Sequence, residues 1–168
     1  MSEFAPAYPR EWEMFWFEIC DRGKYHSWFP SMNLTEAQRV WLAMQEQFFA
    51  KYERFVREWP EWYSSGIWSA PYPGSRASGG MIAYSHLDLS ADLVARFKEW
   101  QTEYNGHKPW APKELDWHSH ARTADGLAGD LKAALGPRIY VEHPELLEVM
   151  ADGSTVSCRE RLGLPEPE

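Results

Sequence analysis

Two histidines at alternate positions, His118 and His120, are the residues whose types and spacing come nearest to a metal site. Zinc accepts imidazole nitrogens, and a His-x-His pair can hold one ion on a strand, where alternate side chains share a face. Here the pair follows Asp116, which we expect to cap a helix, and helical side chains two apart diverge. No Cys-x-x-Cys or His-Glu-x-x-His motif accompanies it. We expect solvated histidines, no metal and no cofactor; a small enzyme with a site around this pair is the alternative.

The other candidates for covalent chemistry are the two cysteines, Cys20 and Cys158. A cysteine nucleophile needs a histidine and an orienting group beside it, and no local signature surrounds either residue. The Gly- and Ser-containing segments 74–76 and 78–80 match neither of the spaced glycine motifs that cradle phosphate. We therefore expect two structural thiols, a flexible loop and no catalytic residue.

Acidic side chains gather near the C-terminus, around a turn at Ala151-Asp152-Gly153. The carboxylates that we expect to contact a partner are Glu142, Glu145, Glu148 and Asp152. Alternate side chains share a face in a hairpin, so at least two of them should point outward together. Such an edge would attract a basic protein through electrostatic complementarity.

Tryptophans form a second candidate surface, at Trp59, Trp62 and Trp68. Tryptophan and tyrosine are enriched at protein interfaces and can also stack on ligands, so this region is an alternative partner-binding face or a ligand-binding module. The interpretation that we favour is core packing at the end of a long helix. Some of these rings should still be exposed, because tryptophan is seldom fully buried.

Composition limits the class of protein. The chain has 168 residues, 44% of them hydrophobic, and a formal net charge of −8. Such a chain suits one globular domain over residues 1–168, and its negative charge disfavours nucleic acid as a partner. It holds no apolar run long enough for a membrane helix. Its N-terminal residues lack the basic start and apolar run of a signal peptide, and two cysteines are too few for a disulfide framework, so we expect a cytoplasmic protein.

The first half of the chain should supply one long helix. Thr35 followed by Gln38 forms a capping-box pattern, and an apolar stripe predicts a helix from about Glu36 to Glu58, with Phe48 and Tyr52 in the core. Pro60 should stop it. Residues 11–20 read as a strand, although a short buried helix fits the same apolar run, and residues 25–29 could return beside it.

The second half should supply two more helices and short strands. Ser90 caps a helix that ends at Asn105-Gly106, and Asp116 caps a helix to Leu135, stopped by Gly136-Pro137. The expected strands are 81–86 and 139–141, followed by a hairpin of 146–150 with 154–158. Residues 64–80 read as a long loop, and 140–168 as an acidic segment. The predicted fold class is α+β, a single domain of three main helices with a small, mostly antiparallel sheet.

Residues 88–143 resemble a known module. The shared elements are a capped helix ending near Trp100 and Tyr104, a Gly-Leu-Ala helix that closes in Leu135-Gly136, and the short acidic strand 139–143. This pattern resembles small bacterial proteins that include immunity-like partners of polymorphic toxins. The resemblance covers about a third of the chain and implies an immunity protein that binds a cognate toxin by occlusion, without chemistry. It carries over no catalytic residue and does not identify the toxin.

Overall fold

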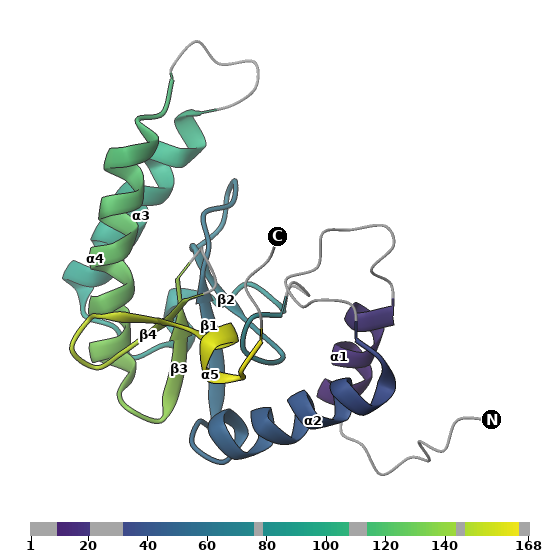
Figure 1. Cartoon of the computed structure of the whole chain (residues 1–168). Helices are drawn as coiled ribbons and strands as arrows, with labels where there is room; N and C mark the ends of the chain where they lie inside the picture. The colour runs from purple at the N-terminus through teal and green to yellow at the C-terminus, as the bar shows by residue number, and fades with distance from the viewer. Residues whose placement is uncertain (1–9, 21–31, 76–78, 108–113, 144–146, 165–168) are drawn as a thin grey trace.

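The structure, a computed structural model, describes residues 10–20, 32–75, 79–107, 114–143 and 147–164 (Figure 1). Its centre is a sheet of five strands in the order β2-β1-β3-β4-β5. The strands are β1 (Arg54–Glu58), β2 (Ile67–Ser69), β3 (Ile139–Glu142), β4 (Leu147–Val149) and β5 (Thr155–Ser157). The β1–β3 pair is parallel and the other pairs are antiparallel. The α+β class and the mostly antiparallel sheet are therefore confirmed.

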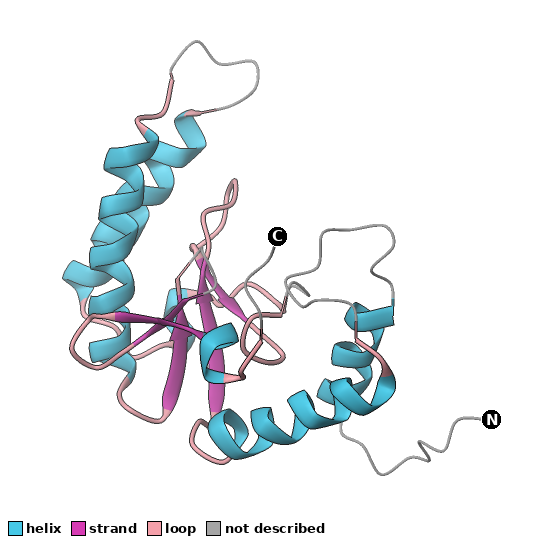
Figure 2. Cartoon of the chain, in the orientation of Figure 1, coloured by secondary structure: helices cyan, strands magenta, loops and turns pink. Residues whose placement is uncertain are grey.

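Helices cover both faces of the sheet (Figure 2). On one side lie α1 (Arg10–Cys20), α2 (Leu34–Met44), its π-helical extension η1 (Gln45–Phe49) and the short α5 (Cys158–Arg161), and on the other α3 (Ala91–Gly106) and α4 (Trp117–Leu135). Each face has its own apolar cluster because strand side chains alternate. Phe55 and Tyr140 pack toward α1 and α2, whereas Val56 and Val141 pack toward α3 and α4.

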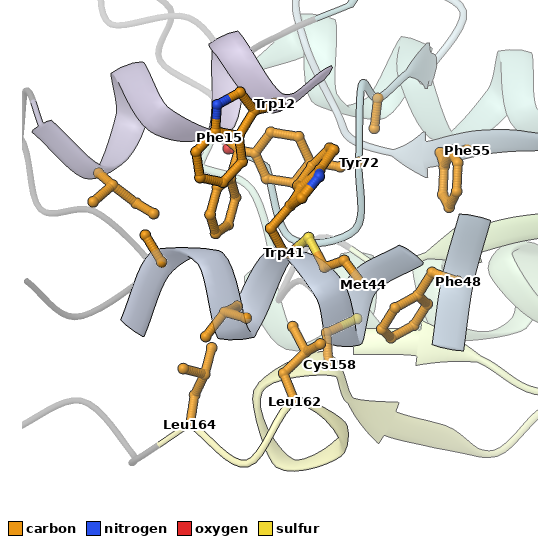
Figure 3. Packing of buried hydrophobic residues seen from close by; sticks show 14 of the residues in the cluster. Trp12, Phe15, Trp41, Met44, Phe48, Phe55, Tyr72, Cys158, Leu162 and Leu164 are labelled. Carbon is orange, nitrogen blue, oxygen red and sulfur yellow. The ribbon is translucent and has the colours of Figure 1, made fainter. Parts of the chain in front are cut away.

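The strand predicted over residues 11–20 is wrong, and the alternative of a short buried helix holds. Trp12, Phe15 and Ile19 are buried at spacings of three and four in α1, which is the period of a helix face. The rings of Trp12 and Phe15 pack on Trp41 of α2 with centroids 5.5 and 5.6 Å apart (Figure 3). The returning strand expected over 25–29 lies outside the described residues.

The observed helix starts earlier and ends sooner than the one predicted over residues 36–58. Asn33, not Thr35, is its N-cap, and it forms a reciprocal capping box with Glu36. The helix continues only to Phe49, after which the chain turns into β1, so Pro60 does not end it. The core prediction is confirmed for Phe48, which is fully buried, and Tyr52 is half-buried against the same cluster.

The later helices and the hairpin are confirmed. The Ser90 and Asp116 side chains accept hydrogen bonds from Leu93 N and Ser119 N, as N-caps of α3 and α4 do. Gly136 follows α4 at a φ of 84°, a conformation that favours glycine. The hairpin forms as β4 and β5, one residue or so inside the predicted bounds.

Between the two halves, the predicted loop and strand are both wrong in part. The expected loop 64–80 contains the strand β2, and the expected strand 81–86 forms only a single bridge between Met81 and Trp68 and the short 3-10 helix η2 (Tyr84–His86). Residues 76–78 of that loop are outside the described part. In the part of the chain that the structure describes, no helix is long and apolar enough to cross a bilayer.

Candidate functional site

Glu142, expected on an outward acidic edge, is fully buried. Its carboxylate forms an ion pair with Arg57 of β1 and accepts hydrogen bonds from Gly74 N at 2.9 Å and the Tyr140 hydroxyl at 3.2 Å. Burial raises the pKa of this carboxyl, and the Arg57 guanidinium opposes that shift. Glu142 therefore ties the loop at Gly74 to the sheet and is not available to a partner.

The remaining acids do not form the predicted edge either. Glu148 is 1% exposed and accepts hydrogen bonds from the Tyr52 hydroxyl at 2.5 Å and from Arg161 of α5. Asp152 is exposed, but it accepts a hydrogen bond from the Ser154 hydroxyl at 2.6 Å within its own turn. Glu145 lies outside the described residues. The prediction that these carboxylates point outward together is wrong for Glu142 and Glu148, because both are buried and each is paired with an arginine, Arg57 or Arg161.

The histidines are not arranged as a pair. His118 is exposed, whereas His120 is buried, so the expectation that both are solvated is wrong for His120. The His120 ring stacks on the Trp100 indole with centroids 4.8 Å apart, and burial lowers its pKa. Among the described residues, no group of three or more His, Cys, Asp or Glu side chains could hold a metal ion.

Cys158 is also buried. Its Sγ lies 2.5 Å from the Tyr140 hydroxyl, and burial raises the pKa of the thiol. A raised pKa disfavours the thiolate, which is the nucleophilic form. The expectation of a structural thiol therefore fits this residue.

The most prominent feature of the surface is a group of exposed large apolar side chains around the β1–β2 loop. Trp59 is 43% exposed, Trp62 37% and Tyr63 75%, while Met81 after β2 is 50% exposed and Trp117 at the start of α4 is 54%. Half-buried Trp68 and Tyr104 complete the group. We call the side chains of Trp59, Trp62, Tyr63, Trp68, Met81, Tyr104 and Trp117 the aromatic surface.

The favoured interpretation of the sequence, core packing at a helix end, is therefore wrong for Trp59 and Trp62. The element directly before them is a strand and not a helix. Strand β1 ends at Glu58, and both exposed side chains lie on the turn that follows. Sequence reasoning also missed Trp117. The sequence does indicate its exposure, because Trp117 directly follows the capping Asp116. The buried apolar residues of the helix begin only at Ala124.

Hydrogen bonds hold this loop against the end of α3. Tyr63 N donates to Asn105 Oδ1 at 2.9 Å, and Trp62 Nε1 donates to the His107 carbonyl at 3.2 Å. Tyr63 adopts a φ of 59°, a left-handed conformation that a residue with a Cβ seldom takes. Both hydrogen bonds tie the β1–β2 loop to the C-terminal end of α3.

Ring contacts connect the loop to α4. The Tyr104 ring lies 6.3 Å from the Trp117 ring and 6.4 Å from the Trp62 ring, between centroids. On the other side of the loop, Trp68 Nε1 donates to the Trp59 carbonyl at 3.0 Å, and β2 bridges to Met81. These contacts connect the β1–β2 loop with the end of α3, the start of α4 and the segment at Met81.

Carboxylates accompany the aromatic rings. Glu61 accepts a hydrogen bond from Trp62 N at 2.9 Å, and it contributes, after burial, to a raised pKa of Tyr104. Glu103 is near enough to His120 to oppose the lowering of that pKa. Exposed Asp116 directly precedes Trp117. The aromatic surface therefore carries negative charge as well as apolar area.

A second arrangement lies at the carboxyl ends of β1 and β3, beneath α4. Glu58 is fully buried, and neither of its carboxylate oxygens has a hydrogen-bond partner in the described part of the chain. Burial, and then the charge of Asp125, raises its pKa well above the ordinary value of 4.5. His143 Nε2 lies 2.6 Å from Asp125 Oδ1. Glu58 is therefore a buried acid whose carboxyl group has no hydrogen-bond partner among the described residues.

We expect Glu58→Gln to stabilise the protein increasingly as pH rises above about 4.5, the ordinary pKa of glutamate in an unfolded chain. Above that pH the unfolded state ionises at Glu58 and the folded state stays protonated, so wild-type stability falls by about 1.4 kcal/mol per pH unit until the folded pKa is reached. Urea unfolding of both proteins from pH 4 to 8 measures the difference. Asp152→Asn, at an exposed acid, is the control; a constant Glu58→Gln difference would contradict the buried-acid interpretation.

An open pocket of about 600 Å³ lies elsewhere, at the start of β1. Phe49, Phe55 and Pro71 form apolar parts of its wall, and the exposed pair of Arg138 with Glu53 lies at its rim. Tyr52 also lines it, and burial raises the pKa of its hydroxyl to about 12, which opposes ionisation. The Tyr52 hydroxyl is therefore not an activated nucleophile.

Comparisons with known proteins found no counterpart: no protein-family model, no curated protein and no solved structure matches this chain.

Proposed function

We propose that this protein is an immunity protein that binds a cognate bacterial toxin in the cytoplasm and neutralises it by occlusion. The single observation that carries the proposal is the aromatic surface, with five large apolar side chains between 37% and 75% exposed around one loop and the adjoining helix end. The resemblance of residues 88–143 to immunity-like proteins supports the same class. A protein that acts by occlusion needs a complementary surface and no reaction centre.

The composition and rigidity of the surface suit tight binding. Tryptophan and tyrosine are enriched among the few residues that carry most of the energy of an interface. The hydrogen bonds from Tyr63 N and Trp62 Nε1 hold the loop in place, so less ordering entropy opposes association. The formal charge of −8 favours encounter with a basic toxin surface. This proposal moves the expected interface from the acidic hairpin to the β1–β2 loop.

We expect Trp59→Ala and Trp117→Ala each to weaken binding to the cognate toxin by about 30-fold or more, the size of an interface hot spot of ~2 kcal/mol. The measurement is titration calorimetry with a purified candidate toxin, sought first among the products of the genes beside this one, together with survival of cells that express that toxin. Phe17→Ala is the matched control, because Phe17 on α1 is also exposed, at 67%, but lies outside the aromatic surface.

Three outcomes separate the alternatives. Wild-type affinity and protection in both tryptophan variants would move the interface away from the aromatic surface. Failure of the wild-type protein to bind or protect against the adjacent toxin would contradict the immunity function itself. Binding of a sugar, detected as a change in tryptophan fluorescence and lost in Trp117→Ala, would favour a ligand-binding module.

A further inference from the structure

We infer that the aromatic surface recognises arginine side chains of its partner, whose guanidinium groups would stack on the rings of Trp117 and Trp59 and pair with Glu61, Glu103 or Asp116. The inference rests on the proposed function, because it names the chemistry of the partner at the same surface. Its basis is the combination of exposed indole rings with neighbouring carboxylates, at rings that take part in none of the cation–π pairs described in the structure.

Carboxylates neighbour the exposed rings, most directly at Trp117. Trp117 is 54% exposed, and its ring stands at 75° to Tyr104 and 81° to His107, with centroids 6.3 and 5.2 Å away. Asp116 is its neighbour in the chain, and Glu61 influences the pKa of Tyr104. A planar cation placed against Trp117 would therefore meet both an aromatic ring and a carboxylate.

The basic residues of α3 in the described part of the chain have other partners. Arg96 lies 2.6 Å from Asp130 of α4, and Lys98 Nζ lies 5.9 Å from the centre of the Tyr84 ring. Both precede Trp100, whereas the aromatic surface contacts the helix at Tyr104 and beyond. The cation–π pairs that the structure describes thus involve the rings of Tyr84, Tyr52 and Phe48, outside the aromatic surface.

Guanidinium fits such a site better than ammonium. Arginine is planar, stacks on aromatic faces, is weakly hydrated and forms two hydrogen bonds to one carboxylate. Lysine carries the same charge as a compact, strongly hydrated group without that geometry. A surface of indole rings and carboxylates therefore discriminates between the two cations, whereas net charge alone does not.

The test uses short oligo-arginine, oligo-lysine and oligo-glutamate peptides of equal length, titrated into the full chain and followed by tryptophan fluorescence and calorimetry. We expect the arginine peptide to bind several-fold more tightly than the lysine peptide, and the glutamate peptide not to bind. Trp117→Ala should weaken arginine binding about tenfold, Trp117→Phe should retain most of it, and Glu103→Gln should reduce both affinity and its dependence on salt. Phe17→Ala should change nothing.

Equal affinity for arginine and lysine peptides, unaffected by Trp117→Ala, would overturn the inference and show attraction by net charge only. If the toxin nevertheless binds in a Trp117-dependent way, the proposed function stands and only the arginine preference fails. If arginine peptides bind at Trp117 but no toxin is neutralised, the arginine site stands and the immunity function fails. Thermal unfolding of each variant confirms that its fold is retained.

Discussion

Replacing Glu142 with alanine should lower the free energy of unfolding by about 3–5 kcal/mol, the usual cost of leaving one member of a buried ion pair alone. Glu142 is 0% exposed, and Arg57 opposite it is 8% exposed. Without the carboxylate, the Arg57 guanidinium stays in the interior with only the Ser75 carbonyl as a described hydrogen-bond partner. Gly74 N and the Tyr140 hydroxyl lose their acceptor as well.

Urea unfolding at constant pH measures this loss. The control is Glu99→Ala, at an exposed acid of α3, which should stay within about 0.5 kcal/mol of wild type. Combining Glu142→Leu with Arg57→Met should recover much of the stability, because removing both charges leaves neither unpaired. A Glu142→Ala loss below about 1 kcal/mol would show that the pair is solvated rather than buried.

Phe48→Ala should cost about 3–5 kcal/mol, because the ring is fully buried and its removal leaves a cavity. The ring contacts Tyr140 edge-on at 5.8 Å, and the Arg161 guanidinium lies 4.9 Å from its centre. The same denaturant titration measures the loss, with Phe17→Ala as a control of identical chemistry at a residue that is 67% exposed. Similar losses in the two variants would contradict the burial of Phe48.

The elements that could be predicted from the sequence are those whose signals are local. Ser90 and Asp116 cap their helices through their own side chains, and the turn at Gly153, with a φ of 82°, fixes the hairpin within a few residues. No contact with a distant segment is needed to recognise these features. The α3–α4 half was therefore predicted with nearly correct bounds.

The secondary structure predicted for the first half of the chain was wrong because a segment that is buried on two faces shows no clear strand or helix periodicity. Phe55 and Val56 extend the apolar stripe of the preceding helix, yet in β1 they face opposite clusters of the core. In residues 11–20, aromatic side chains are so dense that alternation and helical spacing both fit, and only packing against Trp41 decides. Tertiary contacts decide whether these segments form a strand or a helix, and a single sequence does not reveal those contacts.

The candidate site was predictable only in part. Trp59 and Trp62 were named as an alternative surface, but their exposure follows from the end of β1, which the prediction placed inside a helix. The prediction of an exposed acidic hairpin was wrong because the density of charge along the chain does not show which carboxylates are buried. Glu142 meets Arg57, 85 residues earlier, and no local pattern indicates that partner.

The separation of 85 residues between Arg57 and Glu142 also governs the order in which parts of the chain can fold. Strand β1 has β2 as an early neighbour, but its parallel partner β3 follows only after α3 and α4. At a synthesis rate of about 5–20 residues per second, the interval between Arg57 and Glu142 lasts on the order of 4–17 s. During that time one edge of β1 and the aromatic side chains beside it lack their final cover. We therefore expect nascent chains to be most prone to aggregation before β3 leaves the ribosome, and this long-range pairing to limit the folding rate more than helix formation does.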